Sequence, residues 1–290
     1  MMSHTVVDSF QPLTLSVSFG HLSAVKSAQN APIKLVALHG WLDNLGSVLP
    51  ILTELPTISS LTFDWRGHGF SDWATSSHYV FSDYLNDLQE VLSQETDQPV
   101  WLLGHSLGAL TATAYAAIYP EKIAGLILIE GLSPLYEEAE NVVSRLRQHI
   151  NGEAISKNIG RQCFDNEDQA ILWRSRINQT TLAQISPIVK RGLMQKDGRW
   201  QWRFDPKLWL SSSGRFTHTQ AQYLCEQVRC PVLSLVGNKG FPTLRDPLGE
   251  LSWFQCIEQV VLSGRHHCHL QNVTQSAALI LNFLAVHDRT

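Results

Sequence analysis

Residues 104–108 read Gly-His-Ser-Leu-Gly, and this pentapeptide decides the fold. The apolar run Pro99–Leu103 before it is typical of a buried strand, and the small residues of Ala109–Ala117 after it are typical of a helix. A strand, a G-x-S-x-G turn and a helix in this order place a serine on a tight turn, where two glycines leave room for the neighbouring strand and helix. The alternative is a small-residue turn without chemistry. In the first interpretation the Ser106 hydroxyl projects from the sheet edge, beside helix amides that favour an anion.

The composition describes an ordinary globular protein. A length of 290 residues suits one large domain, or a core with one inserted subdomain. An apolar content of 44% and a charged content of 17% are sufficient for a real core. The net charge of −4 favours neither nucleic acid nor an anionic membrane, and no apolar run approaches the roughly 20 residues that span a bilayer. We therefore expect no nucleic-acid partner and no membrane partner.

The cysteines and the N-terminus indicate a cytoplasmic protein. The five cysteines are scattered, odd in number and without paired metal-ligand spacing, at Cys163, Cys225, Cys230, Cys256 and Cys268. We expect them to be reduced thiols. Met1–Gln11 has no long apolar segment and is a poor secretory signal. Cys268 lies between His267 and His269, but no second ligand cluster supports a metal tract, so we expect no metal and no cofactor.

Short apolar runs alternate with helical patterns on both sides of a long central stretch. The predicted strands are Thr14–Phe19, His21–Val25, Ile33–Leu38, Leu61–Asp64, Pro99–Leu103, Ile123–Ile129, Pro231–Gly237 and Gln259–Leu262. The predicted helices are Leu45–Leu55, Phe81–Gln94, Ala109–Ala117, Asp246–Phe254 and a closing helix that ends near Leu284. Strands that alternate with helices predict a mainly parallel sheet with helices on both faces.

The pattern changes between residues 133 and 226, where helical patches replace the long apolar strands. Three helices are predicted there: Ala139–Ile150, Asn166–Arg176 capped by Asp165, and one from Thr180 through Met194 with a break or kink at Pro187. A short strand begins at Trp200. We predict an inserted cap over residues 133–226, on a core made of residues 1–132 and 227–290. Clustered tryptophans are usually buried packing, so we expect most of its aromatic residues to form the cap's own small core.

Four motifs together resemble the α/β-hydrolase superfamily, and the resemblance extends from Thr14 to Leu284. They are His39-Gly40-Trp41, Asp64-x-Arg66-Gly67-His68-Gly69-x-Ser71, the pentapeptide at 104–108 and the late His266. The resemblance implies an α/β fold with a mostly parallel eight-stranded sheet, helices on both faces and an inserted helical cap. Residues 38–44, 128–132 and 202–206 are similar to the serine hydrolase-like (kraken-type) branch.

The resemblance assigns a nucleophile and a base. Ser106 would be the nucleophile, which needs a base to remove its proton. His266 would be that base, because it follows the last strand, where the superfamily carries its histidine, in a Gly-x-His turn. His267 and His269 are the alternatives. We expect His105 to pack rather than react.

An oxyanion hole requires two preorganised donors. We expect the backbone N–H of Leu107, directly after the nucleophile, and the backbone N–H of Trp41, after His39-Gly40, to supply them. The side chain of Trp41 either walls the pocket or packs. Asp43 and Asn44 are expected to hold the shape of this loop.

The carboxylic acid that would orient the histidine departs from the family pattern. The superfamily usually carries an aspartate in the loop after the strand that ends at Gly237, but Gly240 stands at the expected place. Glu130, directly after an apolar strand, is the acid we expect, and some members, including certain haloalkane dehalogenases, place their acid there. A poorly solvated carboxylate at this point could orient the histidine and stabilise its cation. The alternatives are that Glu130 caps a helix or pairs with an arginine, and that Asp246 is the acid.

These assignments predict a carboxylesterase-type serine hydrolase that forms an acyl-enzyme on a small-molecule ester. Serine at position 106 argues against the dehalogenases and epoxide hydrolases, which attack with a carboxylate. One alternative is a C–C hydrolase or hydroxynitrile lyase that uses the same triad. Another is a catalytically impaired binding protein, for which Gly240 is the best argument. The substrate and the oligomeric state are not predicted.

Overall fold

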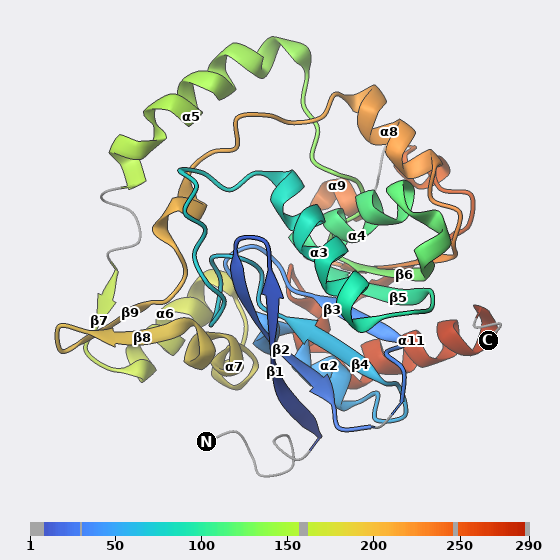
Figure 1. Ribbon diagram of the computed structural model, residues 1–290, viewed down its shortest axis with the longest axis horizontal. Coiled ribbons are helices and arrows are strands. Elements are labelled where there is room, and N and C mark those ends of the chain that lie inside the picture. The colour runs from blue at the N-terminus through green and yellow to red at the C-terminus, as the bar shows by residue number, and fades with distance from the viewer. Residues whose placement is uncertain (1–8, 30, 157–161, 246–248, 288–290) are drawn as a thin grey trace.

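A mixed eight-stranded sheet forms the centre of the computed structural model, which describes residues 9–29, 31–156, 162–245 and 249–287 (Figure 1). The strand order is β1-β2-β4-β3-β5-β6-β10-β11. The strands are β1 (Phe10–Val17), β2 (Gly20–Ser27), β3 (Leu35–Leu38), β4 (Ser60–Phe63), β5 (Val100–His105), β6 (Ile123–Ile129), β10 (Val232–Gly237) and β11 (Ile257–Leu262). β2 runs antiparallel to β1 and β4, and the other neighbours are parallel. The predicted α/β architecture with a mostly parallel eight-stranded sheet is therefore confirmed.

Helices cover both faces of this sheet. One face packs against α3 (Phe81–Glu95), α4 (Leu107–Ile118) and α8 (His218–Glu226), and the other against α2 (Leu49–Thr53) and α11 (Val273–His287). Neighbouring residues of one strand point to opposite faces of the sheet. In β3, Val36 packs in the core on the side of α3 and α4, and Leu35 packs in the core on the side of α2 and α11. Burial on both faces explains why these strands read as continuous apolar runs.

The residues between β6 and β10 carry a small three-stranded sheet of order β7-β9-β8. The elements are α5 (Val142–Ser156), β7 (Cys163–Phe164), α6 (Glu167–Asn178), α7 (Leu182–Gly192), β8 (Leu193–Lys196) and β9 (Arg199–Trp202). Phe164, Ile185 and Val189 belong to a separate apolar cluster, against which Trp200 and Trp202 pack as expected, whereas Phe204 lies in the main core. In Figure 1 α6, α7 and the small sheet lie together at one end of the molecule, while α5 arches away from them.

Several short helices complete the chain. They are η1 (Leu45–Ser47), η2 (Pro120–Lys122), η3 (Ala139–Asn141), η4 (Pro206–Trp209), α9 (Pro242–Arg245), η5 (Glu250–Trp253) and α10 (Cys268–Gln271). The helix predicted over Asp246–Phe254 is in its described part only the short η5, and residues 246–248 lie outside the described residues.

Two predicted helix starts are wrong by one residue. Asn166, not Asp165, caps α6, because its side-chain oxygen accepts from the Gln169 amide at 2.9 Å. Thr181, not Thr180, caps α7 and forms a capping box with Gln184. Each pair offers two adjacent residues with capping side chains, and the choice between them depends on tertiary packing.

The cysteines form no disulfide: all five are free thiols. Cys268 is fully buried in the core beneath α11. No helix in the described ranges combines the length and apolarity that a bilayer crossing requires.

Candidate active site

Ser106 lies on a strained turn between β5 and α4. Its backbone has φ 50° and ψ −117°, a conformation that costs a non-glycine residue about 1–3 kcal/mol. A Cβ atom at Gly104 would lie 2.4 Å from the Ala109 amide nitrogen, and one at Gly108 would lie 2.3 Å from the Leu38 carbonyl oxygen. Both flanking positions therefore require glycine, which is the physical reason for the G-x-S-x-G pattern.

Glu130 and His266 are in contact at the same edge of the sheet. Glu130 directly follows β6, and its Oε2 lies 3.3 Å from His266 Nδ1. The carboxylate is buried and accepts two backbone N–H groups, from Gly237 at 2.7 Å and from Phe241 at 3.2 Å. A proton on Nδ1, donated to this carboxylate, leaves Nε2 of the imidazole available as an acceptor.

Gly240 faces the Glu130 carboxylate. A Cβ atom at Gly240 would lie 2.1 Å from Glu130 Oε1, so no side chain fits at position 240 while Glu130 is in place. The missing loop aspartate thus coincides with a carboxylate that reaches the same space from β6. Asp246, the alternative acid, lies outside the described residues.

Ser106 and Glu130 line one cavity of about 500 Å³. The Ser106 amide donates to the Ile129 carbonyl at 2.9 Å, which holds the turn against the residue before Glu130. Phe241, another lining residue, packs edge-on against the His266 ring with 4.7 Å between ring centroids. The predicted nucleophile and acid therefore line one cavity, and the predicted base contacts two of its lining residues, Glu130 and Phe241.

The two expected oxyanion donors lie beside this serine, one at the start of α4 and one on the loop after β3. Leu107 is the first residue of α4. Trp41 follows Gly40, and a Cβ atom added at Gly40 would lie 3.2 Å from the Ser106 Cβ atom. The half-exposed indole of Trp41 lies edge-on to Trp209, at 5.4 Å between ring centroids.

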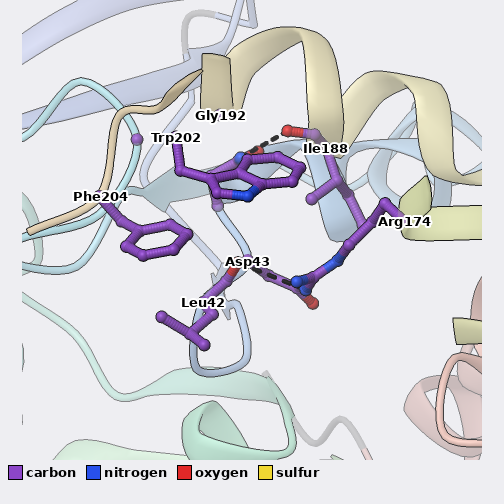
Figure 2. Close-up of a pocket in the computed structure, with 9 residues that line it drawn as sticks. Leu42, Asp43, Arg174, Ile188, Gly192, Trp202 and Phe204 are labelled. Atoms are coloured by element: carbon purple, nitrogen blue, oxygen red, sulfur yellow. Dashed lines mark hydrogen bonds and ion pairs between the residues drawn. The ribbon is translucent and has the colours of Figure 1, made fainter. Parts of the chain in front are cut away.

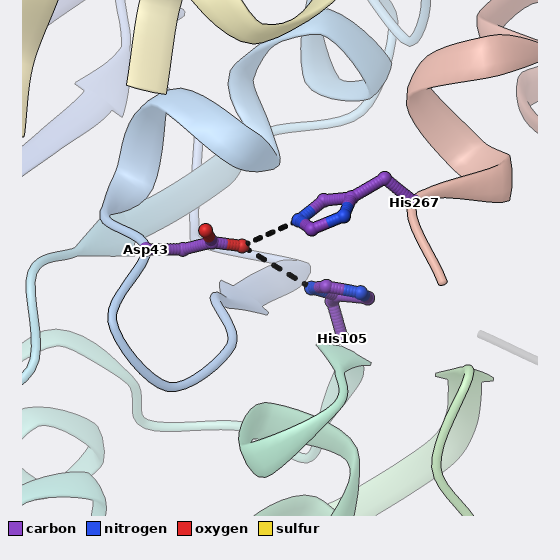
Figure 3. Close-up of side chains that lie close together, drawn as sticks. All are labelled: Asp43, His105 and His267. Atoms are coloured by element: carbon purple, nitrogen blue, oxygen red, sulfur yellow. Dashed lines mark hydrogen bonds and ion pairs between the residues drawn. The ribbon is translucent and has the colours of Figure 1, made fainter. Parts of the chain in front are cut away.

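A buried cluster of Asp43, His105 and His267 lies beneath the site (Figure 3). Asp43 Oδ2 is 2.9 Å from His267 Nε2 and 3.7 Å from His105 Nδ1. Asp43 Oδ1 accepts from Arg174 Nη2 at 2.9 Å. Burial alone raises the pKa of Asp43, but His267 and Arg174 outweigh it and hold that pKa well below its usual range.

This cluster connects three loops of the site. His105 precedes Ser106, His267 follows His266, and Asp43 is two residues after Trp41. His105 Nε2 donates to the His266 carbonyl at 2.9 Å, which joins the serine turn directly to the histidine loop. Burial lowers the pKa of His105 well below 6.5, so the ring is neutral near pH 7. The sequence predicted that His105 packs and that Asp43 holds the shape of its own loop, but it did not predict these contacts between the three loops.

The two alternative histidines have other partners. His267 binds Asp43, and buried His269 lies with Nε2 3.1 Å from the Ser47 carbonyl. Among the described residues, the donor atoms that could hold a metal are those of Asp43, His105 and His267, within 4.8 Å of one another. The hydrogen bonds to Arg174 and His267 already satisfy this carboxylate without an ion.

The segment between β6 and β10 is tied to the core at buried polar contacts. A small cavity of about 10 Å³ lies between the loop at Leu42 and the residues Ile188, Trp202 and Phe204. Figure 2 shows the residues that line it. Arg174 reaches Asp43 across it. Nearby, Arg191 Nη2 lies 2.7 Å from Asp64 Oδ2, whose side chain is fully buried.

Comparisons with known proteins agree with this architecture. A family model described as the alpha/beta hydrolase fold matches residues 34–153. A "probable serine hydrolase" of Drosophila melanogaster is 26% identical over 96% of this chain and 88% of its own length. A human "serine hydrolase-like protein" is 30% identical over 48% of this chain and 70% of its own length.

Solved structures show the same fold over nearly the whole chain. A hypothetical protein from Pseudomonas aeruginosa is 27% identical, with a TM-score of 0.87 over 95% of this chain and 99% of that one. A thioesterase domain from the curacin biosynthetic pathway is 22% identical, with a TM-score of 0.82 over 94% of this chain and 99% of that one. The names of the relatives support hydrolase activity in general.

Proposed function

The chain belongs to the α/β-hydrolase family, and we propose that it is a serine hydrolase that cleaves carboxylic esters through an acyl-enzyme intermediate. The observation that carries the proposal is the contact of 3.3 Å between Glu130 and His266, beside a serine held on a strained turn. A buried carboxylate against an imidazole fixes its tautomer and stabilises its cation, which is what nucleophilic serine chemistry requires.

In the proposed reaction Ser106 Oγ attacks the ester carbonyl carbon while His266 Nε2 accepts the hydroxyl proton. The backbone N–H groups of Leu107 and Trp41 stabilise the oxyanion, and a single such donor is typically worth a factor of about 10²–10³ in rate. The imidazolium then protonates the departing alcohol. A water molecule, deprotonated by His266, attacks the acyl-enzyme, so the acid leaves and Ser106 regains its proton. No cofactor is needed for these steps.

We further propose that residues 133–226 form a cap on a core of residues 1–132 and 227–290. Its separate apolar cluster and three-stranded sheet support this division. The buried pairs Arg174–Asp43 and Arg191–Asp64 would hold the cap over the loops that carry the site. The C-terminal part of the proposed cap is less clearly separated from the core domain, because α8 contributes Ala221 and Cys225 to the main core.

The ester hydrolase is favoured over a catalytically impaired binding protein. The argument for impairment was the missing carboxylate at Gly240, and Glu130 fills that space and contacts His266. No observation favours a C–C hydrolase or a hydroxynitrile lyase.

Fluorophosphonate labelling followed by intact-mass measurement tests the proposal. We expect one adduct on the wild-type protein, none on Ser106→Ala, and turnover of short p-nitrophenyl esters that is lost in the same variant. No adduct on the wild type would favour the binding protein. An adduct without ester turnover would favour a C–C hydrolase or another specialised use of the triad.

A further inference from the structure

The cavity beside Ser106 has a mainly apolar wall. Its volume of about 500 Å³ exceeds what an acetyl group fills. The apolar lining residues are Leu110, Leu132, Pro134, Leu135, Phe241 and Leu244. A wall of this kind favours an acyl chain of several carbons, because each buried CH₂ contributes about 0.8 kcal/mol.

A polar pair interrupts this wall. Tyr136 Oη donates a hydrogen bond to Glu250 Oε1, and both residues line the cavity. Burial, and then the neighbouring Glu250, raise the pKa of Tyr136 to about 12, so the phenol stays a neutral donor near pH 7. Tyr136 also packs against the rings of His218 and Trp253, which holds the pair in place on the cavity wall.

Within the described part of the chain, the charged side chains that line the cavity are all acidic. Its ionisable carboxylates are Glu130, which contacts His266, and Glu250, whose hydrogen-bond partner is the neutral Tyr136. The described residues that line the cavity include no lysine and no arginine. A carboxylate has about four lone-pair sites, so Glu250 can accept further hydrogen bonds after the one from Tyr136.

We infer that this cavity binds the acyl group of the substrate and selects it by charge, with Glu250 as the specificity-determining residue. The preferred acyl group is an apolar chain that ends in a hydrogen-bond donor, a hydroxyl or an ammonium, and a carboxylate in the same place is rejected. The inference rests on the proposed ester hydrolysis. The reason is electrostatic: a substrate anion would meet two like charges, whereas a donor would complete the hydrogen bonding of Glu250.

Four p-nitrophenyl esters of matched length test the inference at pH 7: heptanoate, 6-hydroxyhexanoate, 6-aminohexanoate and the monoester of adipate. We expect kcat/KM for the hydroxy and amino esters to exceed that for the adipate ester at least about tenfold, the size that one charge–charge term produces in a partly shielded site. Equal values across the series, or a preference for adipate, would overturn the inference. Absence of turnover on heptanoate as well would instead reject the proposed function.

Two cavity variants and one control assign the selection to the Glu250 charge. Glu250→Gln should reduce the amino-to-adipate ratio at least about fivefold, because it removes the like charge. Tyr136→Phe keeps that charge, so the ratio should persist. Glu258→Gln removes a charge from an exposed position on β11 and should leave the ratio as in the wild type. Both esters are measured with the same preparation of each variant, so the ratio does not depend on the fraction of that variant that is folded. An unchanged ratio in Glu250→Gln would contradict the assignment.

Discussion

Gly240 and the carboxylate of Glu130 compete for one space: a Cβ atom on the glycine would lie 2.1 Å from Glu130 Oε1. The two positions from which an acid can reach His266, the end of β6 and the loop after β10, therefore exclude each other. This exclusion gives a physical reason for the absent loop aspartate and leads to the first two predictions.

Glu130→Gln should lower kcat for a p-nitrophenyl ester by about 10²–10⁴-fold, because the imidazolium that forms in the reaction loses its counter-charge. Circular dichroism should show an intact fold, since glutamine is nearly isosteric with glutamate. Asp246→Asn is the matched comparison, and we expect little change in its kcat. A large loss in Asp246→Asn with none in Glu130→Gln would transfer the acid role to Asp246.

An aspartate at position 240 should be able to replace the carboxylate of Glu130. Gly240→Asp alone should lower the melting temperature, because its side chain overlaps Glu130. Combined with Glu130→Ala, the same aspartate has room and lies in the loop next to the imidazole. The double variant should recover at least about tenfold in kcat over Glu130→Ala, given that a correctly placed carboxylate is worth more than that. Equal kcat values for Glu130→Ala and for the double variant would show that position 240 cannot supply the acid.

Asp43→Asn should disturb both stability and catalysis. The substitution leaves Arg174 largely buried without its partner, which typically costs about 3–5 kcal/mol in the free energy of unfolding. It should also lower kcat with little change in KM, because Asp43 positions the loops and does not contact substrate. Urea unfolding and steady-state kinetics measure the two effects. Asp165→Asn, which breaks the exposed pair with Arg199, is the control and should change neither appreciably.

Stability should fall as the pH drops below about 6.5. Burial lowers the pKa of His68 and of His269 to about 3, whereas both titrate near 6.5 in the unfolded chain. Between these values the unfolded state binds more protons, so each histidine removes about 1.4 kcal/mol of stability for each unit of acidification. Urea unfolding at pH 7, 6 and 5 measures the slope, and His269→Gln should make it shallower. A slope unchanged by His269→Gln would mean that this ring is already protonated in the folded protein.

Local patterns predicted the parts of the site that a short stretch determines. Strand, glycine turn and helix located Ser106, and a charged residue directly after the apolar run of β6 singled out Glu130. These features depend on periodicity and on local sterics, which a single sequence carries. The same holds for the eight-stranded sheet.

The contact between Glu130 and His266 was expected only through the family resemblance, and other contacts between distant segments were not predicted from the sequence. Asp43 meets Arg174 and His267 across 131 and 224 residues, and Tyr136 meets Glu250 across 114. Nothing local distinguishes these residues from ordinary surface charges. The contact with Arg174 depends on how the segment between β6 and β10 lies against the loop after β3, and the other two contacts depend on where the chain after β10 lies.

The two backbone hydrogen bonds that Glu130 receives have an evolutionary consequence. Because the carboxylate anchors the amides of Gly237 and Phe241, loss of this side chain would loosen the turn after β10 even in a protein without activity. A descendant that abandoned chemistry would remain under selection for an acceptor here. A glutamate at this position in a homologue is thus a weak marker of an active enzyme, whereas its joint retention with Ser106 and His266 is a strong one.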